Sequence, residues 1–343
     1  MNEEQLKKWK EKRQKRRDSF NSDGLLSGIL SGDLQSLSSG ITLLESNRKK
    51  DKEEAQKLVN SCLKYSGKSI RVGVTGVPGV GKSTFIESFG QVVIDKGFKI
   101  AVLAIDPSSE KSGGSILGDK TRMNQLSVQE NAFIRPSAAG KSLGGVARKT
   151  RESIILCEAA GYDFILIETV GVGQSETMVN SMVDFFMLLM LAGAGDELQG
   201  IKRGIMEMAD ALVITKADGD NLLKARRAKK EYENAMHLFP ANENEWIPKA
   251  LVASAVENYN IVKTFDTIES FMNQTKINGS FLINRKRQDK YWLHETIAET
   301  LMLSFYSSES LVKVIAEVEK DVVEGKMSSF EGAEKLMKIY NHE

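Results

Sequence analysis

Residues 70–84 read Ile-Arg-Val-Gly-Val-Thr-Gly-Val-Pro-Gly-Val-Gly-Lys-Ser-Thr, an apolar run followed by a glycine-rich loop that ends in lysine, serine and threonine. The loop, residues 76–83, fits the pattern Gly-x-x-x-x-Gly-Lys-Ser and stands between a predicted strand and a predicted helix, the context in which this pattern binds phosphate. The glycines let backbone N–H groups close around the phosphates, and the helix N-terminus adds its dipole. This stretch predicts a P-loop nucleotide-binding protein.

The side chains at the end of the loop each have an expected contact with the nucleotide. Lys82 would bridge the β- and γ-phosphates, Ser83 would supply a hydroxyl to Mg²⁺, and Thr84 is placed to contact the α-phosphate. The backbone around the phosphates would come from Gly76, Gly79, Val80 and Gly81.

Short apolar runs on both sides of the loop indicate a parallel sheet. They cover residues 70–74, 100–105, 164–167, 185–191, 211–214 and 250–252. Runs rich in Val, Ile and Leu that lack strict alternation are typical of strands buried on both faces. We therefore expect an α/β P-loop NTPase fold with a mainly parallel sheet flanked by helices, and ligands at the carboxyl ends of its strands.

Helical sequence precedes and follows the predicted sheet, so the chain divides into three parts. Residues 1–68 predict an N-terminal helical extension, in which Asp33 can cap a helix. Residues 69–284 form the P-loop domain, and residues 285–343 form a C-terminal helical region. Periodicity alone favours packing of these last helices on the sheet domain over dimer formation.

Composition and charge exclude several classes of protein. The 343-residue chain has 41% apolar residues, and its 47 basic and 46 acidic residues leave no global field that would draw it to nucleic acid or membrane. The most apolar stretch, residues 185–194, is too short to span a bilayer, and no signal peptide is visible. A basic run at residues 7–17 favours a solvated or partner-touching helix over a presequence or a nucleic-acid arm.

The two cysteines do not suggest a disulfide or a metal site. Cys62 and Cys157 lie far apart, with no Cys or His at metal-ligand spacing. Cys157 follows an apolar helical stretch at residues 154–156, so we expect its thiol to be buried. A chain without a disulfide framework suits the cytoplasm, which is the location we expect.

Acidic residues at strand ends predict a Mg²⁺ site. Glu168 ends one strand run, and a carboxylate facing the P-loop would hold Mg²⁺ directly or through water. Asp106 ends another run in the same manner, whereas Asp119 lies in a glycine-containing loop and could equally be a turn residue. Gly171, three residues after Glu168, is placed to sense a γ-phosphate through its backbone N–H.

The segment that follows the run 211–214 predicts the base. In Thr215-Lys216-Ala217-Asp218 the Asp218 carboxylate can accept both N1–H and the 2-amino N–H of guanine, whereas adenine offers it an acceptor at N1 and no 2-amino group. The Lys216 stem would lie over the purine. Thr215 stands where the usual motif has Asn, and because a hydroxyl makes only part of an amide's contacts we expect a somewhat reduced guanine affinity. Ser254 and Ala255 follow the next run, where GTPases often place a backbone contact to the guanine oxygen.

Together these motifs resemble those of the MeaB/ArgK family of GTPases, the accessory proteins of cobalamin-dependent methylmalonyl-CoA mutase and related acyl-CoA mutases. The string Glu-Thr-Val-Gly-Val-Gly-Gln-Ser-Glu at residues 168–176 is the most specific match, because it begins with Glu where most GTPases have Asp. The likeness covers nearly the whole chain. Two residues depart from the family pattern: Thr215 replaces the usual Asn, and Ala192 stands where the family often has Pro. The other matching stretches are residues 76–84, 106–109, 113–123 and 195–202.

The resemblance implies a GTP-hydrolysing chaperone that gates adenosylcobalamin loading and release of damaged cofactor, with cobalamin involved only through the mutase partner. It implies a homodimer formed by the C-terminal helices, and it favours Asp119 as a Mg²⁺-shell residue. It also places Gln174 in a second switch and Lys202 in a third switch that responds to the partner. The expected catalytic residues are therefore Lys82, Glu168, Gln174 and Lys202.

Three alternatives stay open at this stage. A metal-delivery GTPase would need a Cys/His site, which two isolated cysteines and scattered histidines do not make. A kinase of a transport protein would leave phosphate on a protein side chain, and a GTP-responsive scaffold would not turn over. Which acyl-CoA mutase is served, and whether its adenosyltransferase is a further partner, are not decided by the sequence.

Overall fold

The computed structural model describes residues 21–46, 48–105, 123–136, 143–169, 175–193, 203–239 and 242–341. The chain forms two compact units, Met1–Gln288 and Asp289–Glu343. They are described in turn.

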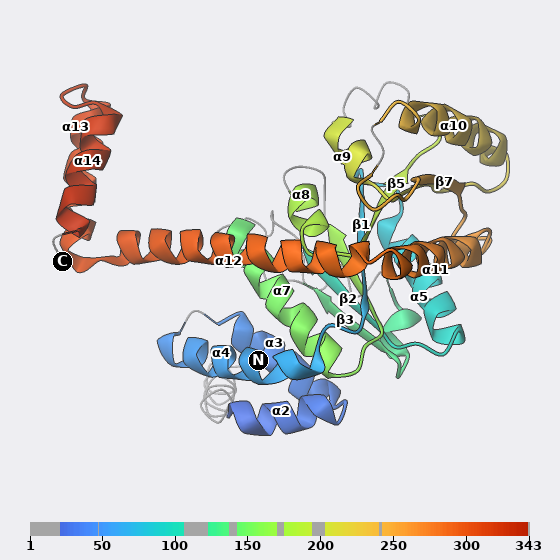
Figure 1. The fold of residues 1–343 in the computed structure, drawn as a ribbon, viewed down its shortest axis with the longest axis horizontal. Coiled ribbons are helices and arrows are strands. Elements are labelled where there is room, and N and C mark those ends of the chain that lie inside the picture. Colours follow the sequence, from blue (N-terminus) through green and yellow to red (C-terminus); the bar gives the residue numbers. More distant parts are fainter. Residues whose placement is uncertain are drawn as a thin grey trace, which may run out of the picture. The chain divides into compact units, whose positions relative to one another are not determined.

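The first unit is built on a seven-stranded sheet in the order β3-β2-β4-β1-β5-β6-β7, and every neighbouring pair is parallel (Figure 1). The predicted α/β fold with a mainly parallel sheet is therefore confirmed. The strands are β1 (Ile70–Gly76), β2 (Ile100–Ile105), β3 (Ala132–Pro136), β4 (Phe164–Thr169), β5 (Phe185–Met190), β6 (Ala211–Ile214) and β7 (Lys249–Val252).

Six of the seven strands coincide with the apolar runs of the sequence. All residues of β2, β4, β5 and β6 are buried, as expected for strands covered on both faces. The sequence analysis missed β3, because this strand is only 5 residues long and ends in Arg135 and Pro136. It lies at the edge of the sheet, where a proline is tolerated.

Helices cover both faces of the sheet. On one face α5 and α11 pack against each other, and on the other face α7 contacts β2 while α8 contacts β4 (Figure 1). The α5–α11 face is an aromatic core in which the Phe265 ring lies 5.5 Å from that of Phe164 and 6.3 Å from that of Phe89. The helices are α5 (Lys82–Asp95), α7 (Leu143–Ala159), α8 (Ser175–Asn180), α9 (Arg203–Met208), α10 (Asn221–Met236) and α11 (Ile261–Ile277).

The N-terminal helices pack beside α7 (Figure 1). They are α2 (Ser22–Leu30), α3 (Leu34–Leu44) and α4 (Lys49–Cys62). Asp33 caps α3 as predicted, since its carboxylate accepts from the N–H groups of Gln35 and Ser36. Arg135 at the end of β3 donates to the Glu45 carboxylate at 2.6 Å, which attaches this extension to the sheet.

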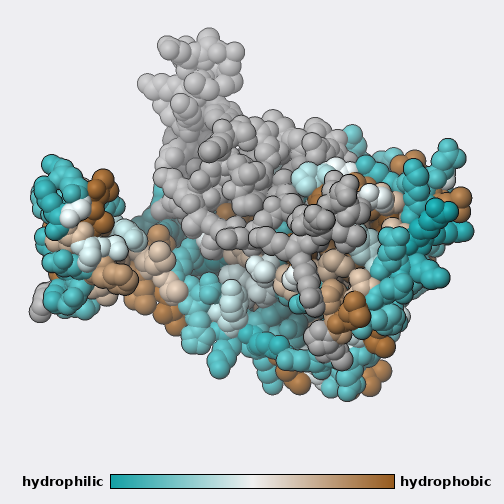
Figure 2. Space-filling model, turned by 90° about the horizontal axis from the view of Figure 1, so that it is seen from above, coloured by the Kyte–Doolittle hydropathy of each residue, from teal (hydrophilic) through white to brown (hydrophobic). Residues whose placement is uncertain are grey.

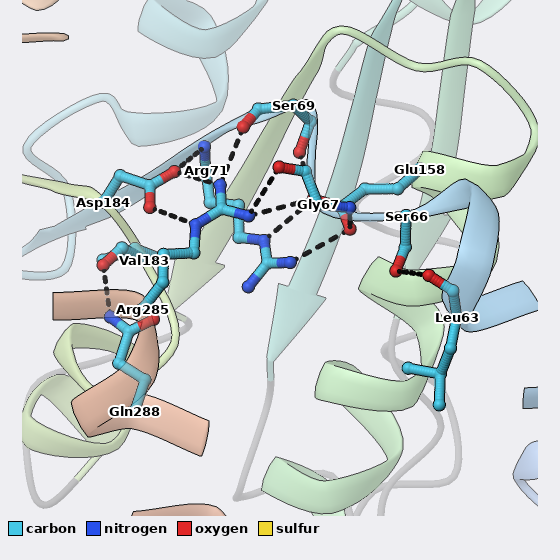
Figure 3. Close-up of polar contacts among 10 residues, drawn as sticks. All are labelled: Leu63, Ser66, Gly67, Ser69, Arg71, Glu158, Val183, Asp184, Arg285 and Gln288. Carbon is cyan, nitrogen blue, oxygen red and sulfur yellow. Dashed lines mark hydrogen bonds and ion pairs between the residues drawn. The ribbon is translucent and has the colours of Figure 1, made fainter. Parts of the chain in front are cut away.

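Figure 3 shows two arginine–carboxylate pairs near the amino ends of β1 and β5. Arg71 on β1 pairs with Glu158 on α7, and Arg285 in the first turns of α12 (Ser280–Ser307) pairs with Asp184 directly before β5. Arg71 makes two hydrogen bonds of 3.0 Å to Glu158, and Arg285 makes two of 2.7 Å to Asp184. Both carboxylates are only 1% exposed, so their charges depend on these partners. This network holds the first turns of α12 against the sheet.

The second unit consists of the rest of α12 with α13 (Glu309–Val323) and α14 (Ser329–Tyr340). The last two helices pack closely, because Gly332 leaves room for the Val318 side chain, which a Cβ would approach to 2.8 Å. Within the described residues, no helix combines the length and the apolar character needed to span a membrane.

Candidate nucleotide site

The P-loop connects β1 to α5 at the carboxyl edge of the sheet. Gly76 closes β1 against β5: a Cβ there would lie 2.6 Å from the Leu189 carbonyl oxygen, so no larger residue fits. Gly81, the residue before α5, has a φ of +92°, which favours glycine. The glycines of the loop are thus required by the close approach of two strands and by the turn into the helix.

Lys82 is the first residue of α5, and its ammonium group lies inside the loop. Its Nζ donates to the Gly76 carbonyl at 2.7 Å and to the Val77 carbonyl at 3.4 Å. Burial lowers the pKa of Lys82, while the charges of Glu168 and Glu176 oppose that shift. The ammonium therefore stands between the loop carbonyls and two acidic side chains.

Ser83 and Glu168 come together as the sequence predicts for two members of one site. The Ser83 hydroxyl lies 3.4 Å from a carboxylate oxygen of Glu168, which is 4% exposed near the end of β4. The next residue, Thr169, shares a hydroxyl–hydroxyl bond of 2.8 Å with Thr75 on β1. This bond sets the end of β4, and with it Glu168, beside the P-loop.

Thr215 ties the loop after β6 directly to the P-loop. Its hydroxyl lies 2.7 Å from the Val80 carbonyl and 3.1 Å from the Met190 carbonyl, and the residue is 5% exposed. Lys216 has a φ of +55°, and its Cε lies 3.9 Å from where a Cβ would stand at Gly81. The hydroxyl that replaces the usual amide therefore has hydrogen-bond partners of its own.

Asp218 is held by the loop that follows β7. The Ser254 hydroxyl donates to one Asp218 carboxylate oxygen at 2.7 Å, and the Ala217 N–H donates to the Ala253 carbonyl at 3.1 Å. The carboxylate is thus oriented before any base reaches it, and Ala255 follows immediately in the same loop.

Ser88 is a site residue that the sequence analysis missed. From α5 its hydroxyl donates to the Ala255 carbonyl at 3.0 Å, so the helix that follows the P-loop also supports the loop after β7. A serine in the middle of an amphipathic helix carries no signal in sequence. Glu176, 1% exposed at the start of α8, is a second buried acid near Lys82 that was not among the predicted site residues.

Five predicted site residues lie outside the described residues: Asp106, Asp119, Gly171, Gln174 and Lys202. Their roles stay predictions. The residues that the structure does bring together at the carboxyl edge are the P-loop, Glu168, Thr215, Lys216, Asp218, Ser254 and Ala255.

Cys157 is buried, as predicted, and so is Cys62. Burial raises the pKa of Cys62 to about 11 and raises the pKa of Cys157 well above its usual range, so neither thiol is poised to react. Across the described ranges, no group of three or more His, Cys, Asp or Glu side chains could hold a metal ion.

Comparison with known proteins identifies the family. The model of the methylmalonyl-CoA mutase-associated GTPase MeaB matches residues 37–310. The chain belongs to the MeaB family of P-loop GTPases. The predicted resemblance is therefore confirmed, and so is the P-loop GTPase fold.

Relatives match along most of their length. The chain is 45% identical to the mouse methylmalonic aciduria type A homolog, mitochondrial, over 93% of this chain and 79% of that protein. It is 45% identical to the GTPase ArgK of Escherichia coli over 81% of this chain and 84% of that protein. The crystal structure of an LAO/AO transport system kinase shares 35% identity with a TM-score of 0.74, covering 93% of this chain and 97% of that one.

Proposed function

We propose that this MeaB-family GTPase is a GTP-hydrolysing chaperone of a cobalamin-dependent acyl-CoA mutase. The observation that carries the proposal is that Thr215 bonds to the P-loop and that Asp218 follows it in the same segment. This contact supports one site for guanine and the phosphates. The mutase assignment rests on membership of a family described as mutase-associated.

Guanine selection follows from the position of the Asp218 carboxylate. Ser254 donates to one of its oxygens, which leaves acceptor capacity for N1–H and the 2-amino group of guanine. Adenine would place an acceptor against the same carboxylate and leave a buried charge without its hydrogen bonds, at a cost of about 1–3 kcal/mol or more. GTP and GDP are accordingly the proposed ligands.

The oxygen donors beside the P-loop fit Mg²⁺. The Ser83 hydroxyl and the buried Glu168 carboxylate lie within 3.4 Å of each other, and Mg²⁺ binds hydroxyl and carboxylate oxygens together with phosphates. Asp106 and Asp119 are the further residues that would hold it. When bound, the ion neutralises charge on the β- and γ-phosphates. Lys82 supplies the second positive charge from the protein itself.

The C-terminal region, residues 285–343, is proposed to form a homodimer. On α12 the side chains of Leu293, Ile297 and Leu301 recur every four residues and are 58%, 47% and 57% exposed. Figure 2 shows apolar side chains among hydrophilic ones over these helices, at the left of the view. An apolar stripe of this kind on an exposed helix marks a surface for a partner.

The proposed cellular role follows the family. Cobalamin would be handled only through the mutase, whose adenosylcobalamin loading and loss of damaged cofactor the GTPase would gate. A location in the cytoplasm is proposed for this chain, and the mutase adenosyltransferase is a possible further partner within this scheme.

One experiment separates this proposal from the alternatives. The full chain is incubated with γ-labelled GTP, with and without a methylmalonyl-CoA mutase, and label is counted as inorganic phosphate and on protein. Free phosphate that increases with the mutase supports the proposal. Label retained on a protein side chain would instead indicate a kinase, and binding without release of phosphate would indicate a scaffold.

A further inference from the structure

A hollow of about 460 Å³ opens at the amino ends of β5 and β6. The P-loop and the base loops follow the carboxyl ends of the strands, so this hollow lies at the opposite edge of the sheet. Its walls come from α8, α9, α11, the first turns of α12 and the segment before β7. No part of the nucleotide site described above lines it.

The charge of the lining is predominantly acidic. Asp184, Glu207, Asp210 and Glu243 face one cation, Arg287. The Asp184 charge is matched by the two hydrogen bonds from Arg285, which Figure 3 shows, and Glu243 pairs with Arg287 at 2.7 Å on the outer rim. These pairs leave Asp210 as the deeply placed acid without a cation among the described residues.

Asp210 stands directly before β6 and is 9% exposed. One carboxylate oxygen accepts from the Phe186 N–H at 2.8 Å. The other oxygen makes no hydrogen bond or ion pair with any residue in the described part of the chain, although the residue lines the hollow. Burial, together with the charge of Asp184, raises the pKa of Asp210 to about 7, against the hydrogen bond from Phe186.

The remaining walls suit an alkyl or aromatic body. Val183, Met208, Phe271 and Phe281 supply apolar surface around the carboxylate. The guanidinium group of Arg285, which does not itself line the hollow, lies 4.8 Å from the centroid of the Phe281 ring, a contact between a cation and an aromatic face. A buried carboxylate beside aromatic rings is a recognition element for an organic cation, and the described residues provide no three-ligand metal cluster here.

We propose that this hollow binds a small organic cation, with an ammonium or guanidinium group on the second carboxylate oxygen of Asp210 and an apolar body against Phe271 and Val183. The site is separate from the nucleotide site and does not depend on the proposed function. The acidic residues of the hollow differ in their contacts. Asp184 binds Arg285 of α12, Glu243 pairs with Arg287 at the entrance, and Asp210 is the carboxylate that would bind the ligand.

The test uses the full chain labelled with ¹⁵N and titrated with n-butylguanidinium chloride and n-butylammonium chloride. The Phe186 amide is the reporter, because its N–H is bonded to the Asp210 carboxylate. We expect a saturable shift of this resonance. We also expect an affinity that rises about tenfold from pH 6 to pH 8, since Asp210 becomes ionised around pH 7 and only the charged form attracts a cation.

Control variants and a neutral ligand distinguish binding to the Asp210 carboxylate from binding to the apolar walls alone. Asp210→Asn can still accept from Phe186 and should lose the saturable shift, whereas Glu231→Gln on the exposed face of α10 should retain it. n-Butanol should give no saturable shift. Equal titration curves for the alcohol and the cations, or a response without pH dependence in the parent protein, would overturn the proposal. GTP affinity, measured in parallel, should not change with the cations.

Discussion

Asp218 is the residue that we propose to select the base, and its carboxylate is already oriented by the Ser254 hydroxyl. Asp218→Asn replaces one acceptor oxygen by a donor, which faces the donor groups of guanine. We expect GTP and GDP affinity to fall by at least about 2 kcal/mol, because a buried hydrogen bond is lost and a donor is left without a partner. Isothermal titration calorimetry measures the effect directly.

The matched control for this variant is Asp220→Asn, an exposed acid two residues further along the same loop. It should bind both nucleotides like the parent. The base assignment would be wrong if the parent bound ATP and GTP equally.

Lys82 and Glu168 are the cation and the carboxylate that we expect to act on the transferring phosphoryl group. Lys82→Ala should abolish hydrolysis, because it removes the cation nearest to the phosphates. Glu168→Ala should leave GDP bound but lose most of the Mg²⁺-dependent turnover, a loss of several kcal/mol in transition-state stabilisation. Phosphate release measured over a range of Mg²⁺ concentrations checks both. A parental rate for Glu168→Ala would mean that its carboxylate only stabilises the fold.

At the scale of helices and strands, burial made most of the fold predictable. The runs that became β2, β4, β5 and β6 are apolar throughout because both faces of those strands are covered. The edge strand β3 was missed since one flank is open and tolerates Arg135 and Pro136. Sequence periodicity cannot detect a strand whose side chains need not be apolar.

The candidate site was predictable for a different reason. The P-loop and the Thr215–Asp218 segment follow strands directly, so parallel topology alone brings them to one edge. Contacts between loops were not predictable: the Thr215 bond to Val80 and the Ser88 bond to Ala255 join residues 135 and 167 positions apart. No local pattern records such distant pairs.

Two arginines in the first turns of α12 allow a test of which ion pair holds this helix to the sheet. Arg285 and Arg287 lie on the same helix and both pair with acids, but Asp184 is 1% exposed whereas Glu243 is 81% exposed. Arg285→Ala leaves a buried carboxylate without its cation, so we expect a loss of about 3–5 kcal/mol in the free energy of unfolding. Arg287→Ala should cost at most about 1 kcal/mol.

Urea denaturation of the two variants measures this difference. Losses of similar size would show that the network in Figure 3 contributes no more than a surface ion pair.

At the scale of the whole molecule, the exposed stripe on α12 predicts self-association. Leu301→Glu places a charge among side chains that a second copy would cover, so the variant should be monomeric at concentrations where the parent is a dimer. Light scattering after gel filtration reports the mass. Val128→Glu, at a more exposed apolar position in the first unit, should leave the mass unchanged. A monomeric parent would contradict the proposed homodimer.

We also expect the partner to change the rate of hydrolysis. The chain has no Gln in the position directly after the Gly171 sensor, where a water-orienting side chain usually stands, so hydrolysis by the free protein should be slow. Lys202 follows a glycine-containing stretch that begins at Gly193, and such a loop can bring a cation to the γ-phosphate once a partner orders it. We expect a cobalamin-dependent acyl-CoA mutase to accelerate hydrolysis and Lys202→Ala to remove that stimulation with little effect on GDP affinity. Lys224→Ala, an exposed lysine on α10, is the control and should be stimulated like the parent. Full stimulation of Lys202→Ala would show that another group responds to the mutase.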